Sequence, residues 1–376
     1  MLRGWGAGTT PAPLLLFLMK VVYLSAAKLP SAAANTIHVV NMCQAYRDSG
    51  CEVLLIVARR TEGYDEIKKF YGVEGNFDIE ETGKSSFLRK SWWYTFYVLK
   101  KLKGLKADLV HGRFLKACFC AAAFLNKKVV FEVHQPVFET KSFIDMILFK
   151  VGSRRIFSKV VVISDSLARF FIKEGVPEDR LLVLHDGSAD VEVKRCNVDY
   201  IRVGYAGKLD PYKGKAVVED LSNFLKRIFR KVEVFVSGRG SEKFVPPSEV
   251  KNLLATFDIC LLPLQGRGRL GSIFLDFSSP LKLFDYMSVG GCIVASRLSS
   301  IEEVLSDKNA VLVPPQDLDM WRNVVARLIM LPSLRKKMSI GARADFCRFY
   351  TWKRRAERIL RSVASRAAPT APVNWG

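Results

Sequence analysis

The chain has 376 residues, of which 49% are hydrophobic and 25% are charged, and this balance excludes a disordered or a fibrous protein. Because single cores rarely grow beyond ~250 residues, the length predicts about two domains. Fifty-eight Lys and Arg against thirty-seven Asp and Glu give a formal net charge of +21. Such a charge favours an anionic partner, which can be a nucleic acid, an acidic lipid or a phosphorylated small molecule.

The first eighteen residues resemble a signal peptide only superficially. Lys20 closes their short apolar run, and cleavage after the alanines at 32–34 would remove Val21–Leu24, which the pattern predicts as a buried strand. We therefore expect residues 1–18 to be a disordered leader extension. No apolar run reaches the ~18 residues of a membrane-spanning helix, so we expect a cytoplasmic protein that is at most peripheral to a membrane.

From Met19 onward, short apolar strands alternate with helices, which is the pattern of a parallel sheet covered on both faces. Residues 19–195 are expected to form one doubly wound, Rossmann-like domain. Its expected strands are 20–25, 52–57, 108–111, 129–134, 159–164 and 181–185, and its expected helices include 36–48, 115–126 and 165–173.

A polar stretch at 191–200 interrupts this pattern, which then restarts. Residues 196–350 are expected to form a second Rossmann-like domain, followed by a C-terminal helix at 351–366 that packs back toward the first domain and a tail at 367–376. The expected strands are 202–205, 232–237, 258–262, 292–295 and 310–313, and the helices 215–228, 249–256, 281–287, 318–330 and 334–346. Ligands of doubly wound sheets lie at the carboxyl ends of the strands, so the cleft between two facing domains is the expected site.

Cysteine usage favours a reducing compartment. The eight cysteines are scattered, and only Cys118 and Cys120 lie close together. No second pair or histidine cluster completes a zinc site. We therefore expect no metal site.

The segment 278–296, SSPLKLFDYMSVGGCIVAS, combines a turn, a helix and a buried strand. Pro280 stands near the helix start, where its missing N–H is harmless, and Gly290 and Gly291 end the helix. The free N–H groups and the dipole of such a helix start attract an anion, and a diphosphate fits there. Asp285 lies one turn inside the helix, where it could accept hydrogen bonds from sugar or ribose hydroxyls.

Two lysines and a glycine turn lie beside strand ends of the second domain. Lys208 and Lys213 flank a turn that contains a proline, and both ammonium groups could reach one diphosphate. The alternative is two solvated loop lysines. Gly238 follows the strand at 232–236, where a ligand could approach the backbone, and a plain tight turn is the alternative.

His134 follows a buried strand, at the edge of the sheet where catalytic groups of this fold lie. It could act as an acid or a base, or orient a leaving group, and a structural histidine is the alternative. His111 and His185 are placed in the same way after their strands, whereas His38 falls inside the first helix as a packing or capping residue.

Taken together, five stretches resemble the retaining glycosyltransferases of family 4, which are two-domain enzymes with the GT-B fold. These stretches are 207–214 (GKLDPYKG), 236–240 (VSGRG), 255–264 (ATFDICLLPL), 279–296 and 300–317, and the stretch 34–56 adds to them. The resemblance implies a hexosyltransferase-type enzyme that moves a sugar from a nucleotide-diphospho-sugar to a glycan or a lipid-linked acceptor, without a metal. The nucleotide-sugar is then a substrate and not a cofactor.

The resemblance also implies a role for single residues. Lys208 and Lys213 match the basic pair on the donor diphosphate, and Asp285 matches the second acid of the family's Glu-x7-Glu motif, which holds the ribose. His134 matches the histidine near the donor sugar. The other residues expected to bind the donor are Gly207, Gly238, Ser279, Pro280, Leu281, Lys282 and Glu303.

One position departs from the family. Eight residues before Asp285 the chain has Phe277 where the family has an acid, and Asp276 is its neighbour. This departure motivates the alternative of a catalytically silent protein that binds a nucleotide-sugar or acts as a scaffold. An epimerase of the same fold is a third reading, which would need more carboxylates in the cleft.

Basic and aromatic residues interleave in 84–131, where Asp108 is the only Asp or Glu among eleven Lys and Arg up to Lys128. A basic helix with Trp and Tyr is typical of proteins that lie on an anionic bilayer. We therefore expect peripheral membrane binding, which suits a lipid-linked acceptor. The alternative is an amphipathic helix packed on its own domain. No nucleic-acid recognition module is present, so no nucleic-acid partner is expected.

Overall fold

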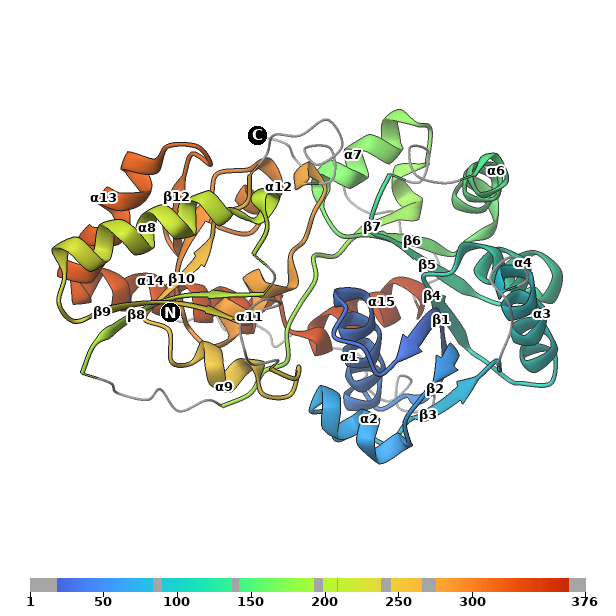
Figure 1. Cartoon of the computed structure of the whole chain (residues 1–376). Helices are drawn as coiled ribbons and strands as arrows, with labels where there is room; N and C mark the ends of the chain where they lie inside the picture. Colours follow the sequence, from blue (N-terminus) through green and yellow to red (C-terminus); the bar gives the residue numbers. More distant parts are fainter. Residues whose placement is uncertain are drawn as a thin grey trace, which may run out of the picture.

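The computed structural model describes residues 19–83, 90–136, 142–192, 199–207, 209–237, 245–265 and 275–364. Two parallel sheets with helices on their faces follow one another along the chain (Figure 1). This arrangement confirms the predicted α/β class, with two doubly wound domains of the GT-B type.

The first sheet has seven strands in the order β3-β2-β1-β4-β5-β6-β7. Its strands are β1 Lys20–Leu29, β2 Glu52–Arg60, β3 Asp78–Glu81, β4 Leu109–Gly112, β5 Val129–Val133, β6 Lys159–Val162 and β7 Leu181–Val183. The helices around it are α1 Ala34–Asp48, α2 Tyr64–Tyr71, α3 Lys90–Lys103, α4 Leu115–Leu125, α6 Phe143–Val151 with a π-helical turn at Gly152–Ile156, and α7 Asp165–Lys173. Central strands such as Val21–Leu24 are completely buried, because a parallel sheet is covered on both faces.

The second sheet has five strands in the order β12-β11-β10-β8-β9. Its strands are β8 Ile201–Ala206, β9 Val232–Ser237, β10 Ile259–Leu262, β11 Cys292–Ser296 and β12 Ala310–Val313. The helices are α8 Lys215–Ile228, α9 Val250–Leu254, α11 Leu281–Ser288, α12 Ser299–Glu302, α13 Leu318–Met330 and α14 Pro332–Phe349, with a 3-10 turn at Pro211–Lys213.

The last described helix, α15 (Trp352–Ala364), lies beside α1 of the first domain, far from the sheet that precedes it in the chain (Figure 1). Trp352, Ala356, Ile359 and Leu360 are buried in the same hydrophobic cluster as Val39 and Tyr46 of α1. This return anchors the end of the chain on the first domain, because an amphipathic helix must bury its apolar face.

The sequence pattern missed several elements of the first domain, among them α2, β3 and α6. The strand β3 contains one apolar residue in the sequence DIEE and lies at the edge of the sheet. An edge strand needs less hydrophobic surface than a central one, so periodicity gave no signal. Within the described residues, no helix combines the length and the apolar character needed to cross a bilayer.

Candidate active site

Two lysines converge at the carboxyl edge of the second sheet. The strand β8 ends at Ala206, and Gly207 follows it with a φ of +115°, which suits glycine and few other residues. A side chain there would meet the Nζ atom of Lys282 at 3.1 Å, so Lys282 lies over this glycine. Lys213 follows on the next turn, where Asp210 caps the backbone and lies 3.5 Å from the Lys213 ammonium.

The ammonium group of Lys282 has no carboxylate within 4 Å among the described residues. Its Nζ donates to the Tyr205 hydroxyl at 2.9 Å and lies 4.1 Å from the centre of that ring. Burial and the neighbouring charge of Lys213 lower the pKa of Lys282 to about 7, although Asp210 acts in the opposite sense. A buried ammonium without a counter-ion is costly, and an anionic ligand would supply the missing charge.

The helix α11 begins beside these lysines, with Pro280 as its N-cap and no side chain capping its first N–H groups. The hydroxyl of Ser279 accepts a 2.9 Å hydrogen bond from the Asp186 N–H of the first domain, and Leu281 packs against the first-domain cluster. The helix start therefore lies at the domain boundary, with free N–H groups of the kind that bind anions.

Asp285 faces a cavity between the domains, which is lined by residues such as Ile37, Gly187 and Trp352 and has a volume of about 260 Å³. Its carboxylate accepts from the Ser188 hydroxyl at 2.5 Å. Burial raises the pKa of Asp285, although the charge of Lys251 and the hydrogen bond from Ser188 act to lower it. Burial also disfavours the charged form of Lys251, and it lowers the pKa of this lysine to about 8. Asp285 thus occupies the domain interface, open to a ligand on the cavity side.

Glu303, which follows α12, reaches across to the first domain. Its carboxylate accepts from the backbone N–H groups of Asp165 and Ser166, each at 2.8 Å, and from the Ser166 hydroxyl at 2.8 Å. It therefore caps the N-terminus of α7, where a negative charge is favourable. In this conformation the carboxylate serves the contact between the domains.

Phe277 also points to the first domain. Its ring lies 5.5 Å from that of Phe170 in α7 and packs against the first-domain core. Its carbonyl accepts from the Ser164 hydroxyl at 3.2 Å. The aromatic residue at this position therefore joins the two domains, and Asp276 beside it is exposed.

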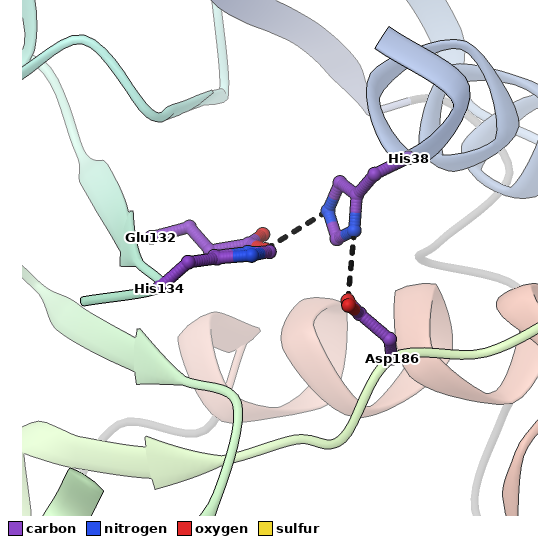
Figure 2. Close-up of side chains that lie close together, drawn as sticks. All are labelled: His38, Glu132, His134 and Asp186. Atoms are coloured by element: carbon purple, nitrogen blue, oxygen red, sulfur yellow. Dashed lines mark hydrogen bonds and ion pairs between the residues drawn. The ribbon is translucent and has the colours of Figure 1, made fainter. Parts of the chain in front are cut away.

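His134, at the end of β5, belongs to a buried network of ionisable groups (Figure 2). Its Nε2 atom is hydrogen-bonded to Glu132, which lies in β5 with a fully buried side chain. His38 of α1 lies between two carboxylates, with Nε2 at 2.9 Å from Glu132 and Nδ1 at 2.9 Å from Asp186. His111 completes this side of the network, with Nε2 at 3.0 Å from Glu132.

Arg355 of α15 closes the network from the other side, with both terminal nitrogens 3.3 Å from the Glu132 carboxylate. Burial opposes ionisation of Glu132, but Arg355, His38 and the hydrogen bonds from His111 and His134 outweigh it and hold its pKa well below the ordinary value. Burial and the charge of Arg113 lower the pKa of His134 to about 4. His134 is therefore neutral at physiological pH.

Four members of this network have the side chains of a metal site, since ligand atoms of His38, Glu132, His134 and Asp186 lie within 4.8 Å of one another. However, Arg355 already neutralises Glu132, and each ring nitrogen of His38 faces a carboxylate oxygen. These side chains are therefore paired with one another by charge, although the Nε2 atoms of His38 and His111 make no hydrogen bond of good geometry. Sequence reasoning missed Glu132, Asp186 and Arg355, and the one available signal was a charged residue inside the buried strand VVFEV.

The predicted residues thus fall into separate groups. Gly207, Lys213, Lys282 and the start of α11 gather at one edge of the second sheet, whereas His134 belongs to the first domain. Lys208 and Gly238 lie outside the described residues.

Two family profiles match the chain. Glycosyltransferase Family 4 matches residues 36–188, and a profile described as glycosyl transferase-like matches residues 218–361. A D-inositol 3-phosphate glycosyltransferase of Saccharomonospora viridis is 24% identical over 234 residues, which cover 51% of this chain and 54% of the relative. The chain thus spans about half the length of this curated relative.

Solved structures share the fold across nearly the whole chain. A sucrose-phosphate synthase from Thermosynechococcus elongatus has a TM-score of 0.68 at 13% identity, covering 91% of this chain and 98% of its own. HepE of Anabaena, in complex with UDP-glucose, has a TM-score of 0.65 at 15% identity, and the match covers 92% of this chain and 100% of HepE. TarM has a TM-score of 0.70 at 11% identity, and the match covers 94% of this chain and 100% of TarM.

Both domains match a glycosyltransferase profile, and the solved structures share the fold over about nine tenths of the chain. The chain therefore belongs to the glycosyltransferases of family 4, with the GT-B fold.

Proposed function

We propose that the protein transfers a sugar from a nucleotide-diphospho-sugar to a glycan or a lipid-linked acceptor. The observation that carries this proposal is that Lys282 lies over Gly207 in the first turn of α11, near the charge of Lys213, and has no carboxylate within 4 Å among the described residues. A diphosphate is the ligand that this charge and these N–H groups favour. A UDP-sugar is the first donor to test, because a structure of similar fold holds UDP-glucose.

In the proposed reaction the bond between the anomeric carbon and the diphosphate oxygen breaks, and the electron pair stays on the diphosphate. The acceptor hydroxyl oxygen forms the new bond to the anomeric carbon, and its proton passes to the departing diphosphate. Charge therefore grows on the leaving group, and Lys213, Lys282 and the start of α11 stabilise it more in the transition state than in the ground state. Family membership supports a retaining outcome without a metal.

His134 is suited to orient a hydroxyl and not to donate a proton. Its Nε2 is engaged by Glu132, and with a pKa of about 4 the ring stays neutral at pH 7. Its Nδ1 atom has no hydrogen-bond partner among the described residues. It can accept a hydrogen bond from a hydroxyl group of the donor sugar or of the acceptor.

The direct test is the hydrolysis of UDP-, GDP- and ADP-sugars by the purified protein. Lys213→Ala and Asp285→Ala are expected to lower turnover of the preferred donor at least tenfold, because each loses a charged hydrogen bond to the donor. Lys353→Ala, an exposed charge on α15, is the matched control. Undiminished turnover in both site variants would overturn the assignment. The anomeric configuration of the product and an assay with a chelator test retention and metal independence.

The alternative function, a catalytically silent protein that binds a nucleotide-sugar, has one observation in its favour. Phe277 replaces the family's acid and packs on Phe170, so this side chain makes no polar contact to a sugar. Calorimetry that detects donor binding by a protein without transfer or hydrolysis would support this alternative.

We also propose that the acceptor is reached at an anionic membrane surface. One face of α3 packs through Tyr94, Val98 and Leu102 into the core, while Trp92, Trp93 and Phe96 are 54%, 48% and 61% exposed. Lys100, Lys101 and Lys103 follow in its last turn. Exposed aromatic rings beside lysines bind anionic bilayers. Failure to sediment with anionic liposomes at low salt would contradict this proposal, and zwitterionic liposomes are the control.

A further inference from the structure

A cavity of about 260 Å³ opens beside His134, at the carboxyl ends of β4 and β5. Its charged and polar lining comprises Arg113, Lys116, His134, Gln135 and Asp145 beside the buried Glu132. This edge of a doubly wound sheet is where ligands bind. No residue of this cavity except His134 has a part in the donor site described above.

Arg113 is the cation of this cavity lining that has no carboxylate partner among the described residues. No ion pair to its guanidinium exists among the described residues, and its one hydrogen bond is a 3.5 Å contact to the Asn35 carbonyl. The guanidinium acts electrostatically on His134, whose pKa it helps to lower. The fork of an arginine is the side chain best matched to a phosphate or a carboxylate.

Lys116 supplies a second positive charge from the first turn of α4. Its Nζ atom lies 3.2 Å from the Ser91 hydroxyl, 3.6 Å from the Asp145 carboxylate and 5.4 Å from the centre of the Trp92 ring. The first turn of α4 has no acidic residue and no capping side chain, so its dipole adds to the attraction for an anion. Asp145, which is half-buried, is the carboxylate of the cavity lining that competes for these cations, since Glu132 is buried and paired with Arg355.

We propose that this cavity binds the phosphate group of a phosphorylated polyol acceptor, with Arg113 and Lys116 as the cationic partners. A dianionic phosphate accepts charge-assisted hydrogen bonds from both side chains and balances both positive charges, whereas a neutral glycan supplies no negative charge. A hydroxyl of the same molecule would then lie beside Nδ1 of His134. That this ligand is the acceptor rests on the proposed transfer reaction, whereas the anion site itself does not.

The test is calorimetric titration of the full chain, with the donor site saturated by UDP so that the probes cannot bind there. The soluble probes are inorganic phosphate and glycerol 1-phosphate. Vesicles of phosphatidylinositol in phosphatidylcholine, titrated with the wild type and with Arg113→Gln, distinguish a lipid headgroup in the cavity from a free phosphate ester, because α3 offers the same anionic-bilayer surface in both proteins. Each variant is titrated separately with UDP.

Arg113→Gln and Lys116→Gln are each expected to weaken glycerol 1-phosphate binding at least tenfold, because each loses a charged hydrogen bond. Asp145→Asn is expected to strengthen it about threefold by removing the competing charge. That gain distinguishes an anion site from a structural role. Lys173→Gln, an exposed lysine at the end of α7, removes the same charge elsewhere on the domain and should change nothing.

Absence of probe binding to the wild-type chain would overturn the inference. So would affinities of the Arg113 and Lys116 variants that equal the affinity of the wild type. If UDP binds and the phosphate probes do not, this inference alone fails. If the phosphate probes depend on Arg113 while no nucleotide binds, the anion site stands and the proposed transfer fails.

Discussion

The guanidinium of Arg355 in α15 donates two hydrogen bonds of 3.3 Å to the carboxylate of Glu132 in β5, although 223 residues separate the two in the chain. The same guanidinium donates to the carbonyls of Leu184 and His185, which precede the link to the second domain. One side chain thus joins the core of the first domain, the interdomain link and the C-terminal helix.

Removing Arg355 should destabilise the protein. In Arg355→Met, the Glu132 carboxylate stays buried with only histidines to balance it, and breaking a buried pair costs about 3 kcal/mol or more. Urea denaturation measures this loss in the free energy of unfolding. Arg361→Met, on the exposed face of the same helix, is the control and should cost less than about 0.5 kcal/mol. Equal losses in the two variants would contradict a special role for the buried pair.

Stability should fall between about pH 6.5 and pH 4 because of the buried histidines. Burial lowers the pKa of His111 and of His134, the latter to about 4, whereas an unfolded histidine titrates near 6.5. In this window the unfolded chain binds more protons than the folded one, so the free energy of unfolding decreases as the pH falls. Glu132, with its pKa well below the ordinary value, loses its contribution only at more acidic pH.

The difference between wild type and His134→Gln isolates one histidine, whose contribution to the decrease between pH 7.5 and pH 5 is about 2 kcal/mol. Urea denaturation at pH 7.5 and at pH 5 measures it. An identical pH dependence in the two proteins would show that His134 titrates normally in the folded state.

Binding of a nucleoside diphosphate should take up a proton at Lys282. With a pKa of about 7 in the empty site, the amine is mostly neutral at pH 8, and an adjacent diphosphate raises its pKa. The complex then holds more protons than the free protein, so affinity declines as the pH rises above 7. Calorimetry with UDP in two buffers of different ionisation enthalpy should detect an uptake approaching about one proton at pH 8.

Lys282→Met should abolish this proton uptake and weaken UDP binding about tenfold or more. Lys251 also has a lowered pKa, of about 8, in the domain interface, so Lys251→Met is the matched control and should retain most of the uptake. Undiminished proton uptake in the Lys282 variant would assign the proton to another group.

The contact of Phe277 with Phe170 should couple the two domains. Truncation of either ring to Ala is expected to cost roughly 1–2 kcal/mol, because both are only partly buried. A double-mutant cycle in urea should give a coupling energy of about 0.5–1.5 kcal/mol for the ring pair. Strictly additive losses would mean that the two rings do not meet in solution. Phe277→Glu is not expected to raise transferase activity, because this side chain points to α7.

Local patterns were sufficient for most of the fold. The strands β9 and β12 and the helices α7, α8 and α13 have the bounds that apolar periodicity predicts. Buried parallel strands are nearly continuous apolar runs, and helices carry a 3.6-residue period, so both are visible within a short window. The start of α11 was visible for the same reason.

Relations between distant segments decided the rest. The residue order could not show that Glu132 meets Arg355, that Lys282 lies over Gly207 without a counter-ion, or that Phe277 turns to the first domain. Charge and burial depend on which elements pack together, and this depends on the whole hydrophobic core and not on neighbours in the chain. The sequence by itself therefore determined two doubly wound domains and a diphosphate-binding helix start, and only the tertiary structure decided which ionisable groups are buried, paired or free to meet a ligand.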